Sequence, residues 1–243
     1  GSLVIEKLDY NTKKTAADAI FHVRGISNGC THINFAIKAS KNAVLPIVDG
    51  ATFTVSDGVI AVKGIPIGTY EITEVSPPPH YDVAVGKNSQ SVQVVNDSEV
   101  SAKVIFENKP YGSLTVVKTD ADTQQKLSGF FFKIKNHTTG FEQIVETGNN
   151  GSVTINNLPE GSYEVTEISA RADYILNSTP VIGEVDWGEE TTVVLKNKAK
   201  PSIEIKKIDS ETGEAISGVE FEIKNKNTQQ SFTSTTDTNG KIK

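Results

Sequence analysis

Three polar residues of different chemistry lie in phase with the apolar residues of short alternating runs. Lys7 shares its strand face with Leu3 and Ile5, because side chains alternate along a strand with period two. Glu74 and Asn108 are in phase with apolar neighbours in the same way. An amine, a carboxylic acid and a carboxamide are therefore directed into an apolar interior. Unpaired polar groups are costly there, so we expect the three to meet.

Burial would make this combination of groups reactive. Desolvation lowers the pKa of a lysine and raises the pKa of a glutamate, so the pair can exist as a neutral amine and a neutral acid. The neutral amine is a nucleophile, and the protonated carboxyl can donate a hydrogen bond to the carboxamide oxygen. Attack on the carboxamide carbon would form a Lys-Asn isopeptide bond and release ammonia. The reaction depends on proximity and runs once per molecule.

The blocks that carry these residues recur along the chain. LVIEKLDYNTKKTAADAIFHVRG, from Leu3, aligns without gaps with LTVVKTDADTQQKLSGFFFKIKN, from Leu114, and with IEIKKIDSETGEAISGVEFEIKN, from Ile203. GVIAVKGIPIGTYEITE, from Gly58, matches GSVTINNLPEGSYEVTE, from Gly151. SAKVIFENKP closes the first unit as TTVVLKNKAKP closes the second. The chain therefore contains two complete copies of one unit and the start of a third.

The second copy repeats the whole reactive set. Lys118, Glu167 and Asn197 occupy the positions that correspond to the first set. In the third copy Lys207 is the matching lysine, but the matching glutamate and asparagine would lie beyond Lys243. We therefore expect Lys207 to be unpaired within this chain and the third copy to be incomplete.

The elements predicted to position these groups are all strands. Short alternating runs are separated by turn-rich clusters such as DYNTKK, DADTQQ and DSETG, and no convincing amphipathic helix is present. This pattern predicts an all-β protein of tandem immunoglobulin-like β-sandwich domains. We expect domains at 1–110, 111–199 and, in part, 200–243. Short proline-bearing joints between them predict an elongated rod.

Composition excludes several classes of function. A net charge of -6 argues against nucleic acid or an anionic membrane as a partner. No apolar run approaches the roughly 20 residues that a membrane-spanning helix needs, so we expect no membrane contact in this segment. Cys30 is the single cysteine, which rules out an intrachain disulfide. No metal-ligand spacing occurs, so we expect no metal and no cofactor.

Three dispersed motifs make the sequence resemble a known family. Each copy begins with Lys-x-Asp on its first strand, and each complete copy continues with a Tyr-x-x-x-Glu strand and ends on a last-strand Asn. The spacing of EVSPPPHY and EISARADY matches a Glu-Thr-x-Ala-Pro-x-Gly-Tyr box, although both lack the Thr and the second lacks the Pro. In these features the chain resembles the collagen-adhesin B-type domain of Gram-positive surface adhesins and pilins, also called Cna B-type, SpaA-type or prealbumin-like.

The resemblance implies both a chemistry and a role. It implies a Lys7–Asn108 bond assisted by Glu74 and a Lys118–Asn197 bond assisted by Glu167. It also implies an extracellular stalk segment of an adhesin or pilin, anchored to the cell wall through regions outside this segment, with adjacent domains as partners. We expect no enzyme, because the only activated groups are consumed by their own reaction. The alternative is a buried hydrogen-bonded cluster that never condenses.

The first copy is 18 residues longer than the second between the first and second blocks. The extra length lies in GISNGCTHINFAIKASKNAVLPIVDGATF, which also contains Cys30. One interpretation is an additional hairpin or a longer loop on the sandwich. The other is a binding surface for a host extracellular-matrix protein or glycan, or a contact with an adjoining domain, because long loops on rigid scaffolds often carry recognition.

Overall fold

The structure, a computed structural model, describes residues 1–84, 88–96 and 101–242 of the chain. These residues form strands joined by turns and loops, with no helix among them. No helix that could cross a membrane occurs in the described part of the chain. Two compact units divide the chain: Gly1–Arg171 with Leu176–Asn197, and Ala172–Ile175 with Lys198–Lys243. The prediction of an all-β protein is confirmed.

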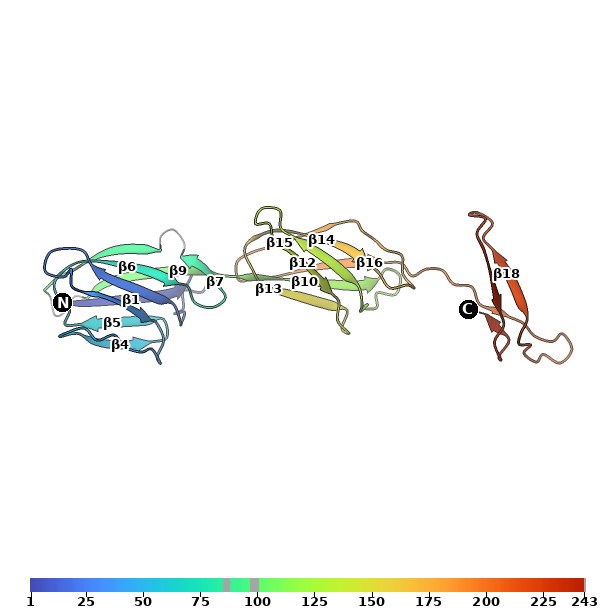
Figure 1. Cartoon of the computed structure of the whole chain (residues 1–243), viewed down its shortest axis with the longest axis horizontal. Helices are drawn as coiled ribbons and strands as arrows, with labels where there is room; N and C mark the ends of the chain where they lie inside the picture. The colour runs from blue at the N-terminus through green and yellow to red at the C-terminus, as the bar shows by residue number, and fades with distance from the viewer. Residues whose placement is uncertain (85–87, 97–100, 243) are drawn as a thin grey trace. The chain divides into compact units, whose positions relative to one another are not determined.

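The first copy consists of two facing sheets (Figure 1). One sheet has the strand order β4-β5-β1-β9-β7 and the other the order β3-β2-β6-β8. The strands are β1 (Ser2–Asp9), β2 (Ile20–Gly25), β3 (Asn34–Lys38), β4 (Thr52–Ser56), β5 (Val59–Lys63), β6 (Gly68–Ser76), β7 (Tyr81–Ala84), β8 (Ser89–Val94) and β9 (Ala102–Pro110). Alternate residues of β1 and β6 are buried, so one face of each strand is turned to the core between the sheets.

That core contains apolar side chains from both sheets. The buried cluster includes Ile5 of β1 and Phe106 of β9 from one sheet, and Phe21 of β2 and Ile72 of β6 from the other. The rings of Phe21 and Phe106 meet across it, with their centroids 5.0 Å apart. This apolar interior surrounds the inward polar residues and keeps water from them.

The second copy repeats the arrangement with fewer strands. Its sheets have the orders β13-β10-β16 and β12-β11-β14-β15. The strands are β10 (Gly112–Asp120), β11 (Phe131–Lys135), β12 (Glu142–Glu146), β13 (Ser152–Leu158), β14 (Gly161–Ser169), β15 (Val181–Val185) and β16 (Glu190–Asn197). In both copies the first and last strands are parallel neighbours, β1 with β9 and β10 with β16.

The longer first copy places an additional strand at a sheet edge. β4 pairs with β5 in an antiparallel hairpin and has no counterpart beside β13 in the second copy. Cys30 of the same region is buried, and its thiol donates to the carbonyl oxygens of Ser27 and Thr69. The additional hairpin is thus present, together with a loop in which Val44 and Ile47 are exposed at 93% and 102%.

The described part of the third copy contains two small sheets. β17 (Ile205–Lys206) pairs with β20 (Lys241–Ile242), and β18 (Glu220–Lys224) pairs with β19 (Ser231–Thr235). By position in the repeat, β17 corresponds to β1 and β10, the β18-β19 hairpin to β11-β12, and β20 to β5 and β13. Lys207 follows β17 and is half-buried, whereas Lys7 and Lys118 are fully buried.

Candidate functional site

Two neighbouring parallel strands and one facing strand position the polar residues of the first copy. Lys7 lies on β1 and Asn108 on β9, two positions beyond the residue paired with Lys7. Glu74 lies on β6 of the other sheet. The amine and the carboxamide therefore come from one sheet and the acid from the facing sheet. All three are buried, with exposures of 0%, 0% and 5% for Lys7, Asn108 and Glu74.

In this first cluster, the carboxylate lies between the amine and the carboxamide. Lys7 Nζ is 3.9 Å from Glu74 Oε1, and Asn108 Nδ2 donates to the same oxygen at 3.0 Å. The amine also donates to the carbonyl oxygens of Leu8 at 3.0 Å and Phe106 at 3.3 Å. Among the described residues, Asn108 Oδ1 has no hydrogen-bond partner. The amine therefore faces the backbone here and not the carboxamide oxygen.

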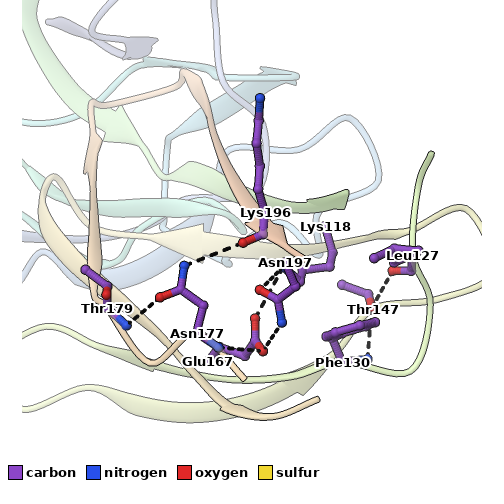
Figure 2. A network of polar contacts seen from close by, with 9 residues as sticks. All are labelled: Lys118, Leu127, Phe130, Thr147, Glu167, Asn177, Thr179, Lys196 and Asn197. Carbon is purple, nitrogen blue, oxygen red and sulfur yellow. Dashed lines mark hydrogen bonds and ion pairs between the residues drawn. The ribbon is translucent and has the colours of Figure 1, made fainter. Parts of the chain in front are cut away.

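The second cluster brings all three groups into direct contact (Figure 2). Lys118 on β10 donates from Nζ to Asn197 Oδ1 at 2.6 Å and lies 3.3 Å from Glu167 Oε2. Asn197 on β16 donates from Nδ2 to Glu167 Oε1 on β14. The exposures of the three residues are 0%, 2% and 1% for Lys118, Asn197 and Glu167. The amine thus contacts both the carboxamide oxygen and the acid, and the acid also accepts a hydrogen bond from the carboxamide nitrogen.

Burial changes the acidity of both lysines. Desolvation lowers the pKa of Lys7 to about 8, although the nearby charges of Glu74, Asp9 and Glu107 oppose the shift. Desolvation also lowers the pKa of Lys118, against the charge and hydrogen bond of Glu167. A lysine with a depressed pKa supplies the neutral amine at a smaller cost, which is the form that attacks a carbonyl carbon.

A glycine holds the backbone of each of these lysines. The N–H groups of Lys7 and Lys118 donate to the carbonyl oxygens of Gly58 and Gly151 at 2.7 and 2.8 Å. Both glycines have positive φ, +81° and +71°, and a Cβ on either would lie within 3 Å of the neighbouring backbone. Only glycine fits such a position without strain. Sequence reasoning did not assign these glycines a part in the site, although each opens the second repeated block.

The aspartate of each Lys-x-Asp motif organises a turn. Asp9 Oδ1 accepts from the N–H of Thr12, and its Oδ2 accepts from the hydroxyl of Tyr81 at 2.8 Å. Burial raises the pKa of Asp9, but these hydrogen bonds outweigh it and the net shift is downward. Asp120 and Asp209 accept from backbone N–H groups in the same manner. The described ranges contain no group of three or more His, Cys, Asp or Glu residues that could hold a metal ion.

The predicted site residues thus form two clusters, and one predicted lysine lies apart from both. Lys7, Glu74 and Asn108 meet in the first copy. The corresponding three residues meet in the second copy, and Lys207 lies outside both clusters with its N–H donating to the carbonyl oxygen of Gly240. Condensation of the lysine with the asparagine in each cluster stays a prediction.

The chain is similar to several solved structures of bacterial proteins. The Bacillus anthracis TIE protein is 24% identical, with a TM-score of 0.39, over 100% of this chain and 42% of its own. A streptococcal ancillary pilin is 22% identical, with a TM-score of 0.40, over 83% of this chain and 62% of its own. The shaft pilin SpaA of Lactobacillus rhamnosus GG is 12% identical, with a TM-score of 0.44, over 83% of this chain and 98% of its own.

The chain therefore spans about two fifths and three fifths of the first two of these proteins. No curated protein matches it. The family described as "SpaA: Prealbumin-like fold domain" matches three times, over residues 1–110, 112–199 and 201–243. These matches cover almost the whole sequence, so the chain belongs to the SpaA prealbumin-like fold domain family.

Proposed function

We propose that the chain is a stalk segment of a bacterial surface adhesin or pilin whose complete domains each form one Lys-Asn isopeptide bond. The observation that carries the proposal is the repeated burial of a lysine, a glutamate and an asparagine on corresponding strands of both complete copies. Burying such a set twice is costly unless the groups are paired or react. The domains would be 1–110 and 111–199, with a partial third at 200–243.

Each bond would form by one balanced substitution. The neutral Nζ of the lysine attacks Cγ of the asparagine, and the Cγ–Nδ2 bond breaks. The carboxyl proton stabilises the carboxamide oxygen in the transition state and is returned to the carboxylate afterwards. One proton of the amine leaves with the Nδ2 amino group as ammonia, and the other stays on the nitrogen of the new isopeptide bond. Glu74 and Glu167 are catalytic residues in this scheme, because each touches the reacting carboxamide. The product consumes its own nucleophile, so the protein turns over no external substrate.

The family and the related structures support the setting of this function. Two of the structures are named as an ancillary pilin and a shaft pilin. A segment of the same family fits an extracellular position on the cell surface, joined to further domains and anchored to the wall through other regions. Covalent bonds between first and last strands would there replace disulfides, which one cysteine cannot form.

Intact mass tests the proposal directly. We expect the purified chain to be lighter than its sequence by two ammonia molecules. Lys7→Ala and Lys118→Ala should each show the loss of one ammonia only, and the double variant should show none. Tandem mass spectrometry should place the cross-links at Lys7–Asn108 and Lys118–Asn197.

Lys196→Ala is the matched control, because that lysine neighbours Asn197 but has an exposed side chain. It should keep both ammonia losses. A wild-type chain of undiminished mass would refute bond formation and leave two buried hydrogen-bonded clusters.

The pH dependence of the first bond follows from the protonation of its cluster. The reactive form is a neutral amine beside a neutral acid. It differs from ammonium beside carboxylate only in the position of one proton, so both forms carry the same total number of protons. The pKa of Lys7 is about 8, so above that pH the cluster loses this proton and the carboxyl has none to donate. We therefore expect the rate of Lys7–Asn108 bond formation to fall as the pH rises through about 8. Timed peptide mapping during cell-free synthesis at graded pH measures the rate. A rate that rises through this range would assign the limiting step to amine deprotonation alone.

A second candidate function rests on the longer first copy. Val44, Leu45 and Ile47 form an exposed apolar group on the loop before β4, with exposures of 93%, 48% and 102%. Such a surface suits a host extracellular-matrix protein better than a glycan. Replacing the three by Ser should abolish capture of matrix proteins while both ammonia losses persist. Unchanged capture would assign the binding elsewhere.

A further inference from the structure

The two clusters share their register but differ in where the amine points. Lys118 Nζ donates to the oxygen of Asn197, whereas Lys7 Nζ donates to the backbone carbonyls of Leu8 and Phe106. The strand register is the same in both copies, because each asparagine lies two residues beyond the residue that pairs with the lysine. The register therefore does not explain the difference. A neighbouring side chain must decide it.

Two buried positions near the lysine differ between the copies: the residue paired with it is Phe106 in the first and Leu195 in the second, and the residue before the next strand is Ala19 in the first and Phe130 in the second. Of these, Phe130 lies against the amine in the second copy. The Phe130 ring is fully buried, and Lys118 Nζ lies 5.1 Å from its centroid. Ala19, at the corresponding position of the repeat, is also fully buried but has only a methyl group. The guanidinium of Arg171 lies 5.9 Å from the same ring centroid. The ring therefore has a cation within cation–π range in the core and another at the surface.

A threonine fixes the backbone that carries this ring (Figure 2). The Phe130 N–H donates to the hydroxyl of Thr147 at 3.2 Å, and that hydroxyl donates to the carbonyl oxygen of Leu127 at 3.0 Å. In the first copy, Ala39 makes the corresponding backbone contact to Ala19 and has no hydroxyl to add. The backbone around Phe130 thus has two hydrogen bonds, both through the Thr147 hydroxyl, that the backbone around Ala19 cannot form with Ala39.

We infer that Phe130 is a positioning residue for the reaction, and that the Lys118–Asn197 bond forms faster than the Lys7–Asn108 bond. This inference rests on the proposed function. The ring occupies the space beside Lys118 and attracts its ammonium, which keeps Nζ against the carboxamide. Ala19 supplies only a methyl group at the corresponding position, and the Lys7 amine must first break two hydrogen bonds to backbone carbonyls. Misplacement of a nucleophile by about 1 Å lowers rates by up to roughly 100-fold.

The experiment compares both bonds in the same chain. Cell-free synthesis with timed acid quenching, followed by digestion, measures the two cross-linked peptides over time, so that each copy serves as a control for the other. We expect the second bond to appear first in the wild type. Phe130→Leu keeps an apolar residue but removes the ring, and should slow the second bond roughly tenfold without changing the first.

Two further variants separate positioning from stability. Ile134→Ala removes buried volume from β11, the strand that Phe130 immediately precedes, and should destabilise the second copy without a comparable loss of rate. Phe130→Tyr keeps the ring and should restore most of the wild-type rate. Slowing by Ile134→Ala as large as that by Phe130→Leu, or equal rates for the two wild-type bonds, would overturn the inference and leave the proposed function intact. Absence of both cross-links from the wild type would refute the proposed function itself.

Discussion

Stretched from its two ends, the second copy should not lengthen at forces that unfold an unbonded sandwich. The chain enters this copy through β10 and leaves through β16, and the proposed bond joins Lys118 to Asn197 on these same strands. Tension would then pass from one strand to the other through the bond. The 79 residues of sequence separation between the two positions would bear no load.

Without the bond, the same copy should open and lengthen. β10 and β16 are parallel, so pulling their opposite ends shears their hydrogen bonds and gives some resistance. Once the strands separate, 79 residues would release roughly 280 Å of contour length at about 3.5 Å per residue. We expect this step in Lys118→Ala and not in the wild type, measured by single-molecule force spectroscopy on the whole chain.

Lys196→Ala again serves as the control, because it alters an exposed lysine of β16 and leaves the cluster intact. It should extend like the wild type. A step of full length in the wild type would show that the strands are not covalently joined. The first copy is unaltered in all three proteins, and its own proposed bond between β1 and β9 should keep it from adding a full-length step to any trace.

Local sequence patterns were enough to predict the strands and the inward polar residues. Period-two alternation places a side chain on a face whatever the rest of the fold does, so Lys7, Glu74 and Asn108 could be assigned to the interior in advance. The repeats then located the second set without further assumptions. Both inferences depend on neighbours close in sequence or on an internal copy.

The contacts of the two amines could not be predicted in this way. We infer that they depend on Phe130 and on its counterpart Ala19, each of which immediately precedes a strand of the facing sheet, β11 or β2. The glycines that accept the lysine N–H groups depend on a left-handed backbone that only the packed structure reveals. The additional strand β4 likewise needed knowledge of its partner β5. Such features arise from packing between distant segments.

Loss of the bond should lower the stability of the second copy by an amount that depends on which group is removed. Asn197→Ala prevents the bond but leaves Lys118 and Glu167 as a buried ion pair, 3.3 Å apart. By analogy with a disulfide closing a loop of this length, we expect the free energy of unfolding to fall by about 4–5 kcal/mol. Glu167→Ala also prevents the bond and in addition leaves the amine of Lys118 without its carboxylate. Breaking a buried pair typically costs about 3–5 kcal/mol, so this variant should be the less stable of the two.

Hydrogen exchange resolved by residue measures both variants in the intact chain. Protection of the amides of β11 and β14 should fall in Asn197→Ala and fall further in Glu167→Ala, while the amides of β2 and β6 in the first copy stay at wild-type protection. Equal protection in the wild type and Asn197→Ala would mean that the bond adds nothing to equilibrium stability. Lower protection in Asn197→Ala than in Glu167→Ala would show that the retained glutamate destabilises the core of the second copy more than the unreacted lysine does.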